Sequence, residues 1–133
     1  MDIARWVIAI FIAIHGVGHA IWFAGAWVPR TSLVNDRPWI LPGEIRITSP
    51  TGRLFSLLAL VAMIGFLGVA FGLASGSDSW RVRLVASAVI SLVAVVPWWR
   101  SSPGTTALNA TLADVGLIVL ALIPFAEKLS ESA

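Results

Sequence analysis

Four long apolar stretches constrain the fold of this 133-residue chain more than any other feature of its sequence. A helix needs about 20 apolar residues to cross a hydrocarbon core of ~30 Å, and a spanning segment must satisfy its backbone hydrogen bonds internally. The stretches of suitable length are residues 6–28, 54–74, 80–99 and 107–126. They predict an all-α membrane protein, an antiparallel four-helix transmembrane bundle in which residues 1–133 form a single domain.

The composition favours a lipid environment. Hydrophobic residues make up 58% of the chain and charged residues 12%, whereas about a quarter of the residues in a soluble domain are charged. The net charge of +2 comes from few charges and forms no basic patch, so we expect the lipid bilayer as a partner and no nucleic acid. The absence of cysteine excludes disulfides and thiolate chemistry.

The N-terminal apolar run imitates a signal peptide, because Arg5 precedes it and the small residues 24–26 follow it. The apolar core of a signal peptide has about 7–15 residues. The run in this chain is longer, and it contains two histidines. We therefore expect it to be the first span, followed by a long loop over residues 29–52.

Polar residues recur near the middle of three of the four spans. His15 and His19 straddle the midpoint of the first span, and Asp114 lies near the middle of the fourth. Ser87 and Ser91 straddle the midpoint of the third. An aspartate at the bilayer centre costs ~2.5–3.5 kcal/mol on insertion scales, so such residues are functional-site candidates. The sequence predicts that these five side chains form a ligand-binding polar cluster at the midplane.

Several chemistries fit that cluster. Histidines four residues apart share a helical face, so His15 and His19 could bind one metal ion, with Asp114 as a third ligand or as an orienting carboxylate. The same geometry suits a proton relay, because histidine titrates near neutrality. A haem or a quinone head group could also bind there, although haem normally takes histidines from different helices. A structural role remains open as well, since interhelical hydrogen bonds in membranes contribute ~0.6–2 kcal/mol each.

Small residues predict close helix packing, which replaces the hydrophobic driving force between helices in lipid. In the first span they recur at steps of three and four, at Ala9, Ala13, Gly16, Ala20 and Ala24. In the second, two overlapping G-x-x-x-G units are formed by Gly68, Gly72 and Gly76. We expect this ridge to pack within the bundle or to mediate a homo-oligomer or a larger membrane complex.

The segment Ile14-His15-Gly16-Val17-Gly18-His19, together with Gly104-Thr105 and Asn109, resembles a group of small bacterial four-span membrane proteins that carry His-Gly-x-x-His in the first helix. A looser similarity links the chain to DoxX-like proteins, which also have four spans and of which some are associated with quinol oxidation. Their usual lysine shortly after the first-span glycine is not present here, where His19 stands nearby. The resemblance implies a four-span fold and the bacterial inner (plasma) membrane.

No nucleophile elbow, H-E-x-x-H motif or phosphate-binding glycine loop occurs, so we expect a non-enzymatic function. The first hypothesis is a binding or accessory membrane protein, such as a subunit of a larger complex. The second is a redox-associated protein that binds a metal, haem or quinone through His15 and His19. The third is an oligomeric small transporter or a proton-coupled channel.

Overall fold

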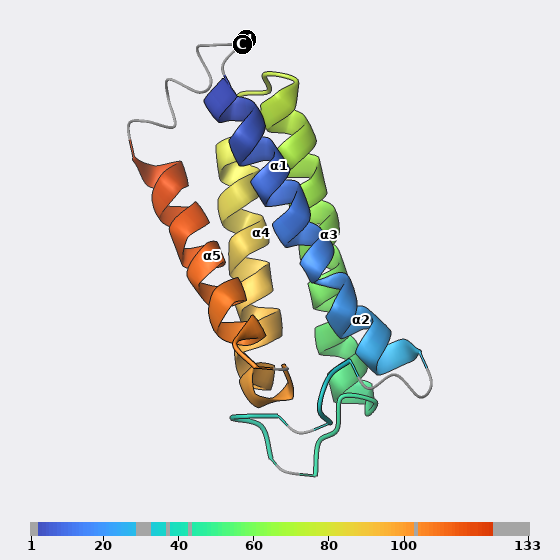
Figure 1. Ribbon diagram of the computed structural model, residues 1–133. Helices are drawn as coiled ribbons and strands as arrows, with labels where there is room; N and C mark the ends of the chain where they lie inside the picture. Colours follow the sequence, from blue (N-terminus) through green and yellow to red (C-terminus); the bar gives the residue numbers. More distant parts are fainter. Residues whose placement is uncertain (1–2, 29–32, 37, 43, 103, 124–133) are drawn as a thin grey trace.

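The chain folds into four helical segments joined by turns and one longer loop (Figure 1). The structure is a computed structural model that describes residues 3–28, 33–36, 38–42, 44–102 and 104–123. Its elements are α1 (Ile3–Gly18), α2 (Ala20–Trp27), α3 (Pro50–Ala74), α4 (Trp80–Val95), the 3-10 helix η1 (Val96–Ser101) and α5 (Thr106–Leu122). No strand occurs in the described ranges, which confirms the expected all-α class.

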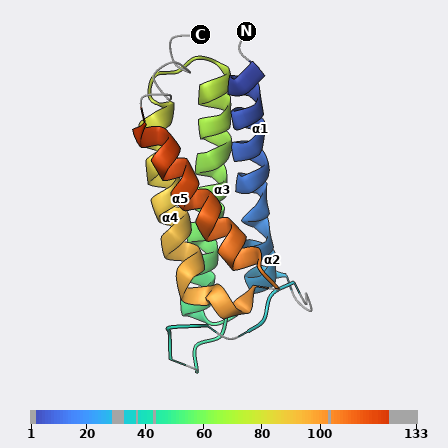
Figure 2. The same cartoon turned by 60° about the vertical axis from the view of Figure 1, so that its left-hand side comes forward.

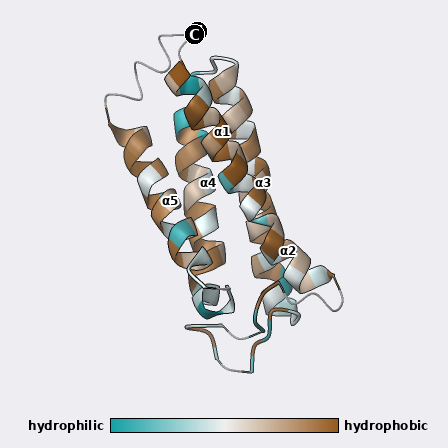
Figure 3. Ribbon diagram, in the orientation of Figure 1, coloured by the Kyte–Doolittle hydropathy of each residue, from teal (hydrophilic) through white to brown (hydrophobic). Residues whose placement is uncertain are grey.

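Three segments are long and apolar enough to cross a membrane: Ile3–Trp27, Pro50–Ala74 and Trp80–Ser101. Helix α5 is apolar but shorter, and residues 124–126 of the expected fourth span lie outside the described residues. Colouring by hydropathy shows apolar residues along all four segments, with polar positions concentrated in the loop and at a few points within the helices (Figure 3).

Helix α3 is central to the packing, because it contacts α1, α2 and α4, while α5 packs against α4. The turn between α3 and α4 lies at one end of the molecule, and the long loop and η1 lie at the other (Figure 1). In the rotated view α5 crosses obliquely in front of α4 (Figure 2). Helices α1 and α5 lack the extensive backbone packing that joins the other neighbours, and side chains bridge them instead.

Helix α3 has a sequence-encoded cap at each end. Pro50 occupies its first turn, and the Ser49 hydroxyl accepts a hydrogen bond from the backbone N–H of Gly52 at 3.2 Å. At the other end Gly76 adopts a left-handed φ of 79°. The N–H of Ser77 then reaches the carbonyl of Gly72, a Schellman arrangement that needs glycine at the left-handed position.

This C-cap corrects the expected glycine ridge. Gly76 lies beyond the end of α3 and serves the turn, so it does not continue a helical face with Gly68 and Gly72. A Cβ atom on Gly72 would meet the Arg83 guanidinium of α4, whereas a Cβ on Gly68 would meet nothing within 4 Å. A homo-oligomer through these residues stays a prediction, and only Gly68 offers a free surface for it.

The sequence predicts one continuous first helix, whereas the structure interrupts this helical segment at His19. The backbone N–H of His19 bonds to the carbonyl of Gly16, three residues back, at 3.0 Å. The N–H of Trp22 bonds to the His19 carbonyl with the same spacing, at 3.2 Å. A tightened turn inside a helix often marks a functional position.

Two arginines each cap the C-terminal end of a helix that packs beside their own. Arg5 is buried, and its guanidinium donates to the carbonyls of Leu73 (2.5 Å) and Ala74 (2.8 Å) at the C-terminus of α3. Arg81 donates in the same way to the carbonyl of Ala121 near the end of α5, at 2.9 Å. A cation is favourable there because the last carbonyls of a helix lack intrahelical donors and carry partial negative charge.

We predict that Gly16 fixes the approach of α1 to α3. A Cβ atom there would lie 2.8 Å from the Cβ of Phe66 and 3.3 Å from the carbonyl oxygen of Met63. The variant Gly16→Ala should therefore lose about 1–3 kcal/mol of unfolding free energy through overpacking, measured by reversible unfolding in detergent micelles. Gly18→Ala is the matched control, because its Cβ would meet nothing within 4 Å. Equal stability of the two variants would contradict the close approach.

Candidate functional site

A hydrogen-bonded cluster centred on Asp114 joins α1, α4 and α5. His15 Nε2 lies 2.7 Å from Asp114 Oδ1, and Ser91 Oγ lies 2.6 Å from Asp114 Oδ2, both within hydrogen-bond distance. His19 Nε2 lies 2.6 Å from the same Ser91 oxygen. We call these four side chains the polar cluster. It brings the two histidines of the first helical segment together with Ser91 of α4 and Asp114 of α5.

The break in the first helical segment creates one further contact in the polar cluster. Because the backbone N–H of His19 bonds to Gly16, it does not take the carbonyl four residues back, which belongs to His15. His19 Nδ1 lies 3.1 Å from that carbonyl oxygen instead. Both ring nitrogens of His19 are thus held, and the orientation of its imidazole is fixed.

The polar cluster is buried among apolar side chains. Asp114 and Ser91 are fully buried, His19 is 3% exposed, and the His15 side chain is 8% exposed. Asp114 is also the only acidic residue within the described helices. Along each contributing helix, the members lie between residues of two separate hydrophobic core clusters, one toward each end of the molecule. The cluster therefore forms a polar layer between two apolar layers.

Aromatic rings enclose the histidines on the α3 side. Phe66, which is fully buried, packs edge-on against His15 with the ring centroids 4.9 Å apart, and it lies 5.6 Å from the ring of His19. Phe66 therefore excludes water from the α3 side of the histidines. Phe11, on α1 itself, stacks parallel to His15 at 6.4 Å and is 50% exposed.

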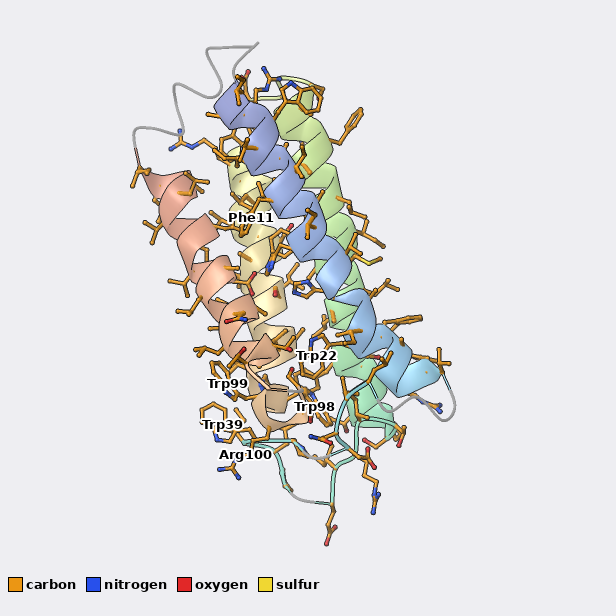
Figure 4. All side chains as sticks on the ribbon, in the orientation of Figure 1. Phe11, Trp22, Trp39, Trp98, Trp99 and Arg100 are labelled. Atoms are coloured by element: carbon orange, nitrogen blue, oxygen red, sulfur yellow. The ribbon has the colours of Figure 1, made fainter. Side chains whose placement is uncertain are left out.

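The other side of the histidines faces a groove of about 340 Å³ between the first helical segment and α5. Its lining comprises Phe11, Ile14, His15, Gly18, His19, Trp22, Thr106, Asn109, Ala110 and Ala113. Phe11 and Trp22, labelled in Figure 4, lie at two levels along the first helical segment. Several lining residues, among them Ile14 and Gly18, are exposed, so the groove opens at the side of the molecule. We call it the lateral groove.

One ring nitrogen of His15, which lines the lateral groove, has no hydrogen-bond partner among the described residues. His15 uses Nε2 toward Asp114, and within the described residues no hydrogen bond engages its Nδ1. A neutral imidazole that donates through one nitrogen accepts through the other. When Nε2–H of a neutral His15 donates to Asp114 Oδ1, the lone pair of Nδ1 can accept a hydrogen bond.

The structure brings together four of the five predicted site residues and separates the fifth. Ser87 is buried one helical turn from Ser91, but its hydroxyl donates to the carbonyl of Arg83 in its own helix at 2.8 Å. It faces Gly65 of α3 and makes no hydrogen bond to the polar cluster. The third span therefore contributes only one of its two central serines.

The aromatic residues of the site were not predicted from the sequence. Phe66 was not expected, because the second span contributes no polar residue to the predicted cluster. Phe11 and Trp22 lie four residues before His15 and three after His19, which is the spacing of one helical face. That spacing could have identified them as neighbours of the histidines.

The predicted metal site is geometrically possible but already filled with hydrogen bonds. Ligand atoms of His15, His19 and Asp114 lie within 4.8 Å of one another. A metal ion would have to displace the protons that these atoms share with each other and with Ser91. Metal binding through His15 and His19 stays a prediction, and the geometry assigns the residues to a hydrogen-bonded network.

Comparison of the chain with protein-family models, with curated proteins and with solved structures gave no match. The resemblance to small four-span and DoxX-like proteins therefore stays a prediction.

We predict that the two central serines of α4 differ in their effect on stability. Ser91→Ala leaves His19 Nε2 and Asp114 Oδ2 without their shared partner, so about 1–3 kcal/mol of unfolding free energy should be lost. Ser87→Ala removes only a bond to the carbonyl of its own helix and should change stability by less than about 0.5 kcal/mol. Reversible unfolding of both variants in micelles measures the difference. Equal losses would refute the polar cluster.

Proposed function

We propose that the chain is an integral membrane protein, an antiparallel four-helix transmembrane bundle. Three segments of suitable length and apolarity support this proposal, as does the abundance of large hydrophobic side chains on the outer faces. Aromatic side chains add support, since tryptophan favours the membrane interface. Trp39, Trp98, Trp99 and Arg100 gather at the loop end of the molecule (Figure 4).

Within that bundle, we propose a binding function: the lateral groove takes a small, planar, hydroxyl-bearing molecule that is dissolved in the bilayer, of the quinol type. The observation that carries this proposal is that His15 lines the groove while its Nδ1 makes no hydrogen bond within the described residues. It accepts one hydrogen bond from a ligand hydroxyl in an otherwise apolar environment, where a directed polar contact fixes orientation.

The position of the groove supports a ligand that arrives from the membrane. It lies between the first helical segment and α5 and opens sideways, toward the acyl chains in a transmembrane bundle. Its volume of about 340 Å³ is suited to one aromatic head group. The walls include the planar side chains of Phe11, His15 and Trp22, which favour a flat ligand.

An apolar extension provides room for a tail. A second groove of about 440 Å³ shares Phe11 and Ala113 with the lateral groove and continues between α1 and α5. Its remaining lining is entirely apolar or glycine: Val7, Ile8, Leu112, Gly116, Leu117 and Leu120. A polar head beside His15 and an apolar tail along α5 describe an amphiphile such as a prenylated quinol, in agreement with the second sequence hypothesis.

Binding of a short-chain ubiquinol tests this proposal. We expect saturable quenching of the intrinsic tryptophan fluorescence of the protein in lipid nanodiscs, because Trp22 lines the groove. The variant His15→Gln retains a donor for Asp114 but loses the acceptor at Nδ1. Its affinity should fall about tenfold, which corresponds to ~1.4 kcal/mol for one hydrogen bond.

Val61→Ala is the control, because this side chain is exposed on α3 and does not line the groove. It should bind with the affinity of the wild type. Trp22→Phe should remove most of the quenching without removing binding. Equilibrium dialysis would measure the binding independently of fluorescence. Absence of saturable binding, or equal affinities for His15→Gln and Val61→Ala, would overturn the proposed function.

A further inference from the structure

The hydrogen-bond geometry of the polar cluster determines how many protons it contains. Two short contacts, each of 2.6 Å, run from His19 Nε2 to Ser91 Oγ and from Ser91 Oγ to Asp114 Oδ2. At such a distance between two electronegative atoms, one of the pair carries a proton that the other accepts. The two contacts therefore need two protons, and the Ser91 hydroxyl supplies only one.

The contact of His19 with the backbone determines its tautomer. A carbonyl oxygen can only accept a hydrogen bond, so His19 Nδ1, which lies 3.1 Å from the His15 carbonyl, must be the protonated nitrogen. A neutral His19 then presents a lone pair at Nε2. The proton of Ser91 would satisfy either this lone pair or Asp114, but not both.

Two arrangements provide the missing proton. In the first, Asp114 is protonated at Oδ2 and donates to Ser91, which donates to Nε2 of a neutral His19. In the second, His19 is an imidazolium that donates to Ser91, which donates to an ionised Asp114. In both, His15 Nε2–H donates to Asp114 Oδ1, and all four contacts of the cluster are satisfied. Both arrangements have the same net charge.

The ordinary protonation states do not provide that proton. An isolated aspartate is ionised and an isolated histidine is largely neutral at neutral pH. With both residues in those states, two lone pairs would face each other across one of the 2.6 Å contacts. This arrangement would be unfavourable in a site where Asp114 and Ser91 have no exposure to water.

We infer that the polar cluster stores one additional proton, shared by His19 and Asp114 through the hydroxyl of Ser91. The proton moves from His19 Nε2 to Ser91 Oγ while the hydroxyl proton of Ser91 moves to Asp114 Oδ2. The O–H bond of serine is thereby broken and formed again, an N–H bond becomes an O–H bond, and no electrons are exchanged. The cluster is a proton relay, a short chain of hydrogen bonds along which a proton is transferred.

The relay has one connection to the lateral groove. His15 contacts Asp114 through Nε2, and the same residue lines the groove. A ligand hydroxyl bound at Nδ1, which rests on the proposed function, would therefore contact the relay through a single imidazole. The inference of a stored proton itself depends only on the geometry of the protein, so it can fail or hold independently of ligand binding.

Magnetic resonance and infrared spectroscopy of the ligand-free protein in lipid bilayers test the stored proton. Ring ¹⁵N shifts distinguish neutral histidine with Nδ1–H from imidazolium, and the C=O stretch of a protonated carboxyl is absent from a carboxylate. At neutral pH we expect either a protonated Asp114 with neutral His19, or an imidazolium at His19 with ionised Asp114. Neutral His19 together with ionised Asp114 would overturn the inference.

Two variants locate the proton. Ser91→Ala removes both short contacts, so the signature of the additional proton should disappear, whereas Ser87→Ala should retain it because Ser87 bonds only within its own helix. Persistence of the signature in Ser91→Ala would show that the proton is not shared through Ser91 and would refute the relay.

Asp114→Asn keeps the test decisive if Ser91→Ala does not fold. The amide oxygen of asparagine can accept from His15, and its N–H can donate to Ser91 as the protonated carboxyl does. This variant should melt within a few degrees of the wild type, lack the carboxyl band and contain neutral His19 with Nδ1–H. An imidazolium at His19 in Asp114→Asn would contradict the inference, because the charge could not be shared with residue 114.

Discussion

The hydrogen bond between His15 and Asp114 is the interaction on which the rest of the structure depends. Helices α1 and α5 lack the backbone packing that joins the other neighbours, and this 2.7 Å contact connects them across a buried site. A carboxyl group within an apolar helix is costly unless it is paired, which explains why every oxygen of Asp114 has a partner. The remaining surface between the two helices is left open as the lateral groove.

The same interaction links stability to the proposed function. His15 contacts Asp114 with Nε2, lines the lateral groove, and has ring contacts with Phe11 and Phe66, so one imidazole joins the buried contact to the groove. The break at His19 adds a second fixed imidazole, since it frees the His15 carbonyl to accept from the side chain. A polar layer between two apolar core clusters thus meets the lateral groove at His15 and His19, where the proposed ligand would bind.

Sequence patterns predicted the helical class and the level of the polar residues, because both follow from hydropathy and from distance along a helix. They could not predict which central serine joins the polar cluster: Ser87 and Ser91 are one turn apart, and only the crossing of α5 over α4 decides between them. The role of Gly76 was also misjudged, because a glycine in a G-x-x-x-G pattern and a glycine in a C-cap look alike in sequence. The buried cap by Arg5 depends on a contact with Leu73, 68 residues away, that no local pattern encodes.

The most direct test of this account is a double-mutant cycle between His15 and Asp114. The unfolding free energies of the wild type, His15→Ala, Asp114→Ala and the double variant would be measured by reversible unfolding in lipid-containing micelles. If this contact joins α1 to α5, the coupling free energy should exceed the ~0.6 kcal/mol that is average for interhelical hydrogen bonds in a membrane protein. Additive losses, with no coupling between the two residues, would contradict the account.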